Sequence, residues 1–255
     1  GSDTLIGPNS TSTWVISSTD RGTLNESIRF FNIPALVGGS GDDTFQFTMT
    51  STTSYLTGSL NAGDGRDTLD YSAYPYSAFA SWNTNQASRV GTRFSASGLA
   101  GRTTNFEIVV GNGDTHVAGP DPGEGNTNQW RLTGENQGNI NNGRYEFSAV
   151  DLVTGGPRED LFYIEDDASL NGFVNGGAED QIVLQDRTTP IDVNITDKRV
   201  DGILSSFAAG KFSVEGDDDN RLVGNGGSLS LTVDGSLNGV SYSSGFSGFY
   251  GTSEE

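Results

Sequence analysis

The sequence repeats itself, and this repetition constrains the fold more than any other feature. The segment 14–25 (Trp-Val-Ile-Ser-Ser-Thr-Asp-Arg-Gly-Thr-Leu-Asn) resembles the segment 130–141. The two segments begin 116 positions apart (130 − 14 = 116). Further residue pairs at a spacing of 116 or 117 positions are Phe31/Phe147, Gly38/Gly155, Asp43/Asp160 and Phe45/Phe162. A third copy begins near Leu222 and is incomplete. We therefore look for one architecture that serves every copy, as in repeat proteins.

The repeat predicts the organisation of the chain. We expect a first repeat over residues 1–118, a second over 119–220 and an incomplete third over 221–255. We interpret them as one continuous segment of a larger protein, in which each repeat contacts its neighbours.

A shorter period lies within each repeat. Gly38–Gln46 is followed by the similar segment Ala62–Asp70, and in the second copy Gly155–Phe162 is followed by Gly176–Ile182. Each segment has glycines, then an acid, then a short apolar run. The run Phe45–Met49 alternates apolar and polar residues, the pattern of a half-buried strand.

These periods predict an all-β chain folded as a right-handed parallel β-helix with coils of about 21–24 residues. The alternative is a series of tandem Ig-like β-sandwiches. Sandwich strands do not normally share one turn motif at this spacing, so the period favours the solenoid. It predicts parallel stacking of the strands that follow Asp43, Asp67, Asp160 and Asp180. The inward-facing residues of these strands should be Phe45, Leu69, Phe162 and Ile182.

Composition excludes several classes of protein. The net charge is −19, which repels nucleic acid and anionic lipid. Hydrophobic residues make up 33% of the chain, and no run approaches the roughly 18 apolar residues of a membrane span. Aromatic residues reach 10%, which argues against a disordered chain. The absence of cysteine fits an exported bacterial protein and also a cytosolic one.

The glycine-aspartate segments resemble a known family. Gly38–Gln46 fits every fixed position of the calcium-binding nonapeptide G-G-x-G-x-D-x-U-x of repeats-in-toxin proteins. Ala62–Asp70 fits it except at the first glycine. The whole repeat resembles the repeat regions of giant bacterial secreted and surface adhesin-like proteins, which implies a secreted or cell-surface location. The motif differs from the family in its spacing, since family nonapeptides follow one another directly, and in Arg158, which replaces a glycine.

The motif predicts two candidate Ca²⁺ sites. The first combines Asp42, Asp43, Asp64 and Asp67, and the second uses Asp160 and Asp180. Calcium takes six to eight oxygen ligands, so one turn cannot supply a site alone and neighbouring coils have to share it. The alternative is that each aspartate accepts backbone N–H groups in its own turn and binds no metal. Both interpretations stay open at this point.

No sequence motif indicates catalysis, and we expect no enzyme activity. The one histidine, His116, is interpreted as a solvated turn residue. Trp14 and Trp130 occupy equivalent repeat positions, which predicts packing in the core. Trp82 lies near several aromatic residues that either pack on their own coil or bind carbohydrate, and packing is favoured; these residues are Tyr71, Tyr74, Tyr76 and Phe79.

The leading functional prediction is a rigid spacer or adhesive stalk within a secreted or cell-surface bacterial protein. Its partners would be neighbouring repeats of the same chain, with cell-surface or matrix carbohydrate as a second candidate. The alternative function is a carbohydrate-binding or carbohydrate-cleaving β-helix domain. No nucleic-acid partner and no membrane insertion are expected.

Overall fold

The computed structural model describes residues 3–48, 56–82, 90–92, 103–176, 180–184, 192–194, 199–200 and 203, and five further strands between 206 and 252. Within these residues the chain forms strands and no helix, which confirms the all-β prediction. None of them therefore forms a helix able to cross a membrane. Two compact units are present: Gly1–Asp121 with Arg144–Val150, and Pro122–Gly143 with Asp151–Glu255.

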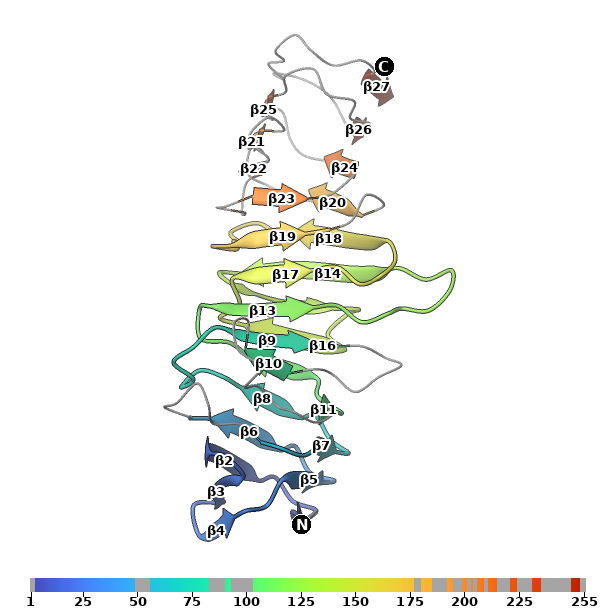
Figure 1. Ribbon diagram of the computed structural model, residues 1–255. Helices are drawn as coiled ribbons and strands as arrows, with labels where there is room; N and C mark the ends of the chain where they lie inside the picture. The colour runs from blue at the N-terminus through green and yellow to red at the C-terminus, as the bar shows by residue number, and fades with distance from the viewer. Residues whose placement is uncertain are drawn as a thin grey trace. The chain divides into compact units, whose positions relative to one another are not determined.

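The first unit contains strands of three sheets (Figure 1). One has the order β4 (Ile28–Phe31), β3 (Arg21–Leu24), β2 (Thr13–Ser18), β6 (Thr44–Phe47), β8 (Thr68–Asp70), β12 (Ile108–Val110) and β16 (Tyr145–Ser148). The second has the order β1 (Thr4–Ile6), β5 (Ala35–Gly39), β7 (Leu60–Gly63) and β11 (Thr103–Thr104). The third contains β10 (Val90–Thr92), β9 (Ala78–Ser81) and β13 (Thr115–Ala118).

The second unit has a comparable set. Its longest series is β15 (Gln137–Ile140), β14 (Asn128–Gly134), β18 (Asp160–Ile164), β20 (Gln181–Leu184), β24 (Lys211–Val214), β26 (Leu231–Asp234) and β27 (Phe249–Thr252). A second series is β17 (Leu152–Thr154), β19 (Phe173–Asn175) and β23 (Ser206–Ala208). A third is β22 (Arg199–Val200), β21 (Asp192–Asn194) and β25 (Arg221–Val223).

Strands that follow the predicted aspartates pair in parallel, as expected. Phe45 of β6 lies opposite Leu69 of β8, and Phe162 of β18 lies opposite Ile182 of β20. All four side chains are buried, which confirms the predicted inward face. Antiparallel pairs such as β2 with β3 and β14 with β15 join strands that are neighbours in the chain. An Ig-like sandwich is instead built from antiparallel sheets, so the parallel pairing disagrees with that alternative.

The first and second repeats each contain an antiparallel hairpin that the sequence pattern did not predict. Strand β2 pairs with β3 in the first repeat, and β14 pairs with β15 in the second. Asn25 and Asn141 follow the second strand with φ of 49° and 56°. Their side-chain oxygens accept the N–H groups of Thr13 and Gln129 at 2.8 and 2.9 Å. Asparagine tolerates this left-handed backbone, which explains its return at the same place in both repeats.

The structure corrects one residue pair of the repeat. Phe30, not Phe31, corresponds to Phe147, because each is the buried third residue of its strand. The turn before the strand covers residues 25–27 in the first copy and 141–144 in the second. The inserted residue therefore falls before this strand, whereas the sequence pattern had placed it afterwards. Phe31 itself is 52% exposed.

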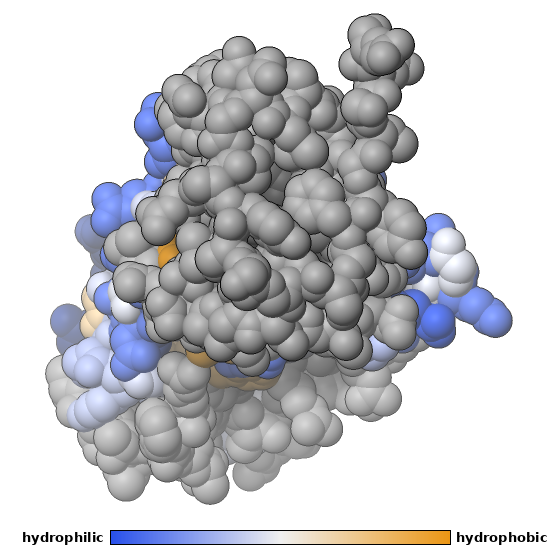
Figure 2. Space-filling view, turned by 90° about the horizontal axis from the view of Figure 1, so that it is seen from above, coloured by the Kyte–Doolittle hydropathy of each residue, from blue (hydrophilic) through white to orange (hydrophobic). Residues whose placement is uncertain are grey.

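The predicted core position of the two repeat tryptophans is confirmed. Trp14 stacks on Phe45 and Trp130 stacks on Phe162, each with ring centroids 5.4 Å apart. Both indole rings are fully buried. Described residues visible in Figure 2 are mostly hydrophilic, with small hydrophobic areas between them. Among the described residues, the large apolar side chains are thus mostly buried on the inward faces of the strands.

Candidate functional site

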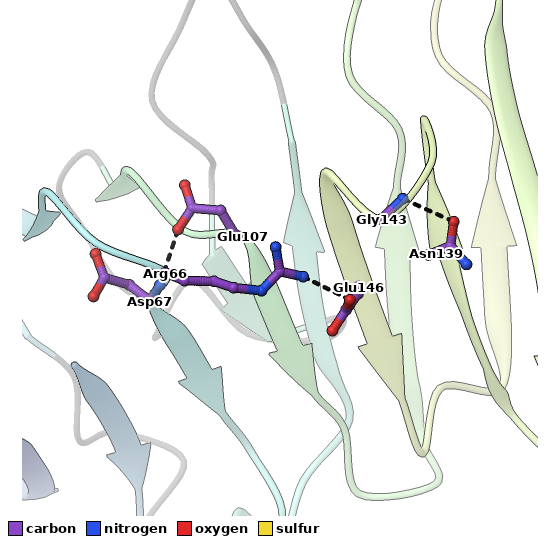
Figure 3. Close-up of polar contacts among 6 residues, drawn as sticks. All are labelled: Arg66, Asp67, Glu107, Asn139, Gly143 and Glu146. Atoms are coloured by element: carbon purple, nitrogen blue, oxygen red, sulfur yellow. Dashed lines mark hydrogen bonds and ion pairs between the residues drawn. The ribbon is translucent and has the colours of Figure 1, made fainter. Parts of the chain in front are cut away.

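Acidic side chains at the strand starts form a chain of hydrogen bonds in the first unit. The Gly39 N–H donates to Asp43 Oδ2 at 2.9 Å. The Asp43 N–H donates to Asp67 Oδ1 at 2.7 Å, and the Asp67 N–H donates to Glu107 Oε2 at 2.9 Å. Figure 3 shows the Glu107 carboxylate directed at the start of β8. Each acid therefore satisfies a backbone amide of the preceding turn or strand, a role that N–H groups outside the sheet ladder require.

Glycine makes room for this arrangement. A Cβ on Gly38 would overlap the carbonyl oxygen of Ala62 and also the Asp43 carboxylate. Gly63 has φ of +113° and lies against the Gly39 carbonyl oxygen. Only glycine combines that backbone angle with such close contact, so the motif glycines let neighbouring turns stack closely.

The second repeat builds the same turn. The Gly156 N–H donates to Asp160 Oδ2 at 2.6 Å, and the Asp160 N–H donates to Asp180 Oδ1 at 2.9 Å. The other oxygen of Asp160 accepts two further bonds, from Asn128 Nδ2 at 2.8 Å and from Trp130 Nε1 at 2.9 Å. Both oxygens of this buried carboxylate thus have donors, as buried polar groups require.

The first repeat lacks the corresponding donors. Asp43 Oδ1, Asp67 Oδ2 and Trp14 Nε1 are buried without a hydrogen-bond partner. Ser12 stands where the second repeat has Asn128, and its hydroxyl donates to the Ser10 carbonyl at 3.0 Å. A buried polar atom without a partner costs about 1–3 kcal/mol, so the first turn carries an uncompensated cost that the second avoids.

The buried position of Asp67 in the first-repeat turn also raises its affinity for a proton. Burial raises the pKa of Asp67 from 3.8 to about 7. This value includes an opposing effect of the Asp43 N–H, which lowers the pKa, and smaller increases from the carboxylates of Asp43, Glu107 and Asp42. Asp67 therefore holds a proton more easily near neutral pH than an ordinary solvated carboxyl does.

The pKa of Asp160 is also raised, but more hydrogen-bond donors oppose the rise than at Asp67. The pKa of Asp160 is raised to about 6, mainly by burial and to a smaller extent by the Asp180 carboxylate. Hydrogen bonds from Trp130, Asn128 and Gly156 lower the pKa because they favour the charged form. A Cβ on Gly155 would lie 2.7 Å from Asp160 Oδ2 and 2.8 Å from Asp180 Oδ2, so both oxygens face the space that this glycine leaves.

The structure divides the predicted calcium ligands into two environments. Asp43, Asp67, Asp160 and Asp180 are buried, and each accepts at least one backbone amide. Asp42 and Asp64 are exposed, and Asp42 Oδ1 accepts the Arg66 N–H at 2.8 Å. Within the described ranges, no group of three or more His, Cys, Asp or Glu side chains is arranged to hold a metal ion. Calcium binding stays a prediction.

Sequence reasoning missed two members of this site, Glu107 and Asn128. Thr44, Thr68 and Ile108 lie opposite one another in the sheet, so the acid before Ile108 corresponds to Asp43 and Asp67. The available signal was an acid directly before an apolar strand, which does not require a glycine-rich turn. Asn128 carried no signal, because the first repeat has serine at that position.

The other singled-out residues belong to the fold. His116 lies in strand β13 and packs edge-on against Phe79 at 4.7 Å between ring centroids, so its assignment to a turn was wrong. Trp82 is buried and donates its Nε1–H to the Phe106 carbonyl at 2.9 Å. Tyr71 and Tyr74 are also buried, so their rings do not form a surface for stacking a sugar. The acidic run 217–219, a further candidate cation patch in the sequence, lies outside the described residues.

Comparison with known proteins adds no assignment. The chain matches no protein family, no curated protein and no solved structure.

Proposed function

We propose that this chain is a structural repeat segment of a secreted or cell-surface bacterial protein and acts as a rigid spacer or adhesive stalk. The observation that carries the proposal is the duplicated turn of Asp43 and Asp160. In both repeats the acid accepts the amide four residues earlier and donates its own amide to the next acid. Both repeats thus have the same hydrogen bonds between neighbouring strands, and such bonds are what a rigid repeat needs.

The proposed architecture is a right-handed parallel β-helix with coils of about 21–24 residues. The acids of neighbouring turns, which are joined by hydrogen bonds, stand 24 residues apart at Asp43/Asp67 and 20 residues apart at Asp160/Asp180. Strands that return in parallel to the same sheet do so with right-handed connections in about 98% of cases. Successive coils would then share one narrow core, in agreement with 33% hydrophobic residues.

The proposal includes the resemblance to adhesin-like proteins with degenerate repeats-in-toxin motifs. Among the predicted ligands, calcium would bind first at Asp43 and Asp67. Each of these carboxylates keeps one oxygen that accepts no hydrogen bond from the protein. Carboxylate oxygens are the ligands that Ca²⁺ prefers, and exposed Asp42 and Asp64 stand in the same turns.

The same site argues against catalysis as the function. A general acid or base has to reach a substrate, whereas Asp43 and Asp160 are buried and occupied by backbone amides. The proposal therefore predicts no hydrolase or lyase activity. Release of reducing ends or unsaturated sugars from an acidic polysaccharide by the pure chain would overturn it in favour of the carbohydrate-cleaving alternative.

Rigidity is the property to measure. The chain has no cysteine, so paired substitutions at exposed positions give clean sites for spin labels. We suggest Ser10→Cys with Ser72→Cys in the first unit and Thr127→Cys with Asn171→Cys in the second. Pulsed electron paramagnetic resonance should give one narrow distance distribution for each pair, which broadens in urea. Broad distributions in native buffer would exclude a rigid spacer.

A further inference from the structure

One strand of the first unit presents apolar side chains at an open sheet edge. Among the described residues, the large hydrophobic side chains that are exposed are Ile6 at 68%, Ile28 at 52% and Phe31 at 52%. Two of them lie on β4, which pairs with β3 on one side and ends the order of its sheet on the other. Figure 1 shows β4 at the N-terminal end of the first unit. An exposed apolar edge strand is a template for pairing with another strand.

The first unit itself contains a model for how such an edge is covered. Strand β16, the counterpart of β4 in the second repeat, is covered by β12 in parallel register. The Glu146 N–H donates to the Glu107 carbonyl at 2.8 Å, and the Gly111 N–H donates to the Ser148 carbonyl at 2.7 Å. Because Phe30 corresponds to Phe147, the matching groups on β4 are the Arg29 N–H and the Phe31 carbonyl.

The charge of this edge indicates the kind of strand that fits. Arg29 is exposed on β4, and the Arg21 guanidinium lies 5.0 Å from the centroid of the Phe31 ring. The chain has 14 Lys and Arg residues against 33 Asp and Glu, so these two arginines place an uncommon pair of positive charges on β4 and β3. At the position of Arg29, β16 carries Glu146, which pairs with Arg66 at 2.7 Å. Two arginines at this edge favour a partner strand that carries an acid.

We propose that the outer edge of β4 binds, in parallel, a strand of a further repeat unit with the chemistry of residues 107–110, an acid followed by Ile and Val. The inference rests on the proposed function, since it takes the repeat as the unit of assembly. Backbone groups would supply the pairing, as in other cases of strand addition. Ile28 and Phe31 would become covered, and the partner's acid would come one residue before the residue opposite Arg29, as Glu107 precedes Ile108 opposite Glu146.

A synthetic peptide with the sequence of residues 105–112 (Asn-Phe-Glu-Ile-Val-Val-Gly-Asn) is the probe. Titrated into the ¹⁵N-labelled chain, it should shift the amide signals of residues 28–31 and slow their hydrogen exchange. Phe31→Glu, which adds a negative charge to an exposed position, should weaken peptide binding at least tenfold. Ile6→Glu is the matched control, because it makes the same kind of change on the edge of another sheet and should leave binding unchanged.

The charge argument has its own test. A peptide in which the acid is replaced by lysine should bind the edge at least tenfold more weakly, and Arg29→Glu in the chain should recover part of that loss. Absence of any shift at residues 28–31, or equal binding by Phe31→Glu, would overturn the proposal. A concentration-dependent dimer that Phe31→Glu abolishes, without peptide binding, would assign the edge to a second copy and also overturn it. Narrow spin-label distances with no peptide binding would reject this docking alone and leave the spacer function standing.

Discussion

The two aspartate turns share one backbone design but differ in how completely their carboxylates are satisfied. In the second repeat, Asn128 and Trp130 donate to the second oxygen of Asp160. In the first repeat, Ser12 replaces the asparagine, and the matching oxygen of Asp43 and the indole N–H of Trp14 have no partner. The duplicated part of the site is thus the bond to backbone amides, and the part that has diverged is the set of side-chain donors.

This difference separates the backbone-amide bonds, which both repeats share, from the contacts of the second carboxylate oxygen, which differ between the repeats. The amide bonds fix the position of each acid at its strand: the bond from the glycine amide measures 2.9 Å in the first copy and 2.6 Å in the second, and the bond from the amide of the acid itself measures 2.7 and 2.9 Å. The carboxylate oxygen that accepts no backbone amide still carries buried charge. A hydrogen-bond donor, a proton or a bound cation can each reduce the free-energy cost of that buried charge. In the second repeat, Asn128 and Trp130 donate to this oxygen. In the first repeat, the unpartnered oxygens of Asp43 and Asp67 could instead bind a proton or a cation.

The largest expected effect tests what the copies share. Phe45→Ala and Phe162→Ala remove rings that are fully buried against Trp14 and Trp130. Each change should lower the free energy of unfolding by about 3–5 kcal/mol, since it deletes a buried aromatic ring and leaves a cavity. Urea unfolding followed by hydrogen exchange would show which unit loses protection. A negligible loss at either site would mean that the two cores are not equivalent.

The inward face was predictable from the sequence, and the antiparallel hairpins were not. Phe45, Leu69, Phe162 and Ile182 follow the glycine-aspartate motif, and a period of two in a short strand then decides which side chains are buried. In β3, by contrast, Gly22 weakens the hydrophobic pattern. A Cβ on Gly22 would overlap the Val15 carbonyl oxygen, so the strand needs glycine for close backbone contact. Such a need cannot be read from hydropathy.

The site was predictable only where the motif was intact. Asp43, Asp67, Asp160 and Asp180 were identified because glycines precede or surround them. Glu107 performs the same amide bond without a glycine motif, so it was missed. The sequence also could not separate buried Asp43 from exposed Asp42, because adjacent residues at a turn point in directions that depend on the local backbone.

The next effect concerns protons and separates the repeats by pH. A carboxyl with a raised pKa stabilises the fold below its unfolded pKa of about 3.9, and this stabilisation is lost as pH rises through the folded pKa. The loss should continue to about pH 7 for Asp67 and to about pH 6 for Asp160. Asp67→Asn should flatten the pH dependence of the urea midpoint between pH 6 and 7. Asp160→Asn should flatten it below pH 6 and not above.

A substitution near Asp67 provides a control for its predicted titration. The groups that face Asp67 are Asp43, Asp42 and Glu107, so Asp42→Asn should lower the pKa of Asp67 without removing the titration. ¹³C NMR of the Asp67 carboxyl would report the pKa directly. A value near 4 would show that the first repeat satisfies its charge by other means.

A smaller effect is expected from exchanging the side chains that distinguish the repeats. Asn128→Ser should lower the stability of the second unit by about 1–3 kcal/mol, because Asp160 loses one donor. Ser12→Asn should stabilise the first unit by about 1 kcal/mol, because the new amide can donate to Asp43 Oδ1. Chemical denaturation of both variants, alone and combined, gives the two values. If Ser12→Asn destabilises the chain, the turns are not interchangeable.

The smallest expected effect is that of calcium, and it tests whether a cation replaces the missing donors. At a Ca²⁺ concentration equal to Kd, a site that exists only in the folded state adds about 0.4 kcal/mol to stability. The unpartnered oxygens of Asp43 and Asp67 favour the first repeat. In the second, Asn128 and Trp130 already donate to Asp160, and Arg158 brings a positive charge into the turn.

Thermal melting in millimolar Ca²⁺ should thus raise the Tm of the chain relative to melting in EGTA. Ser12→Asn should reduce the increase, because its amide would compete for the oxygen of Asp43 that has no partner. Asn128→Ser is the matched change in the second repeat, where Asp160 keeps its bond from Trp130, so it should alter the increase less. If Ca²⁺ leaves both the Tm and the amide signals of residues 39–44 unchanged, protons alone balance the buried charge of the first repeat.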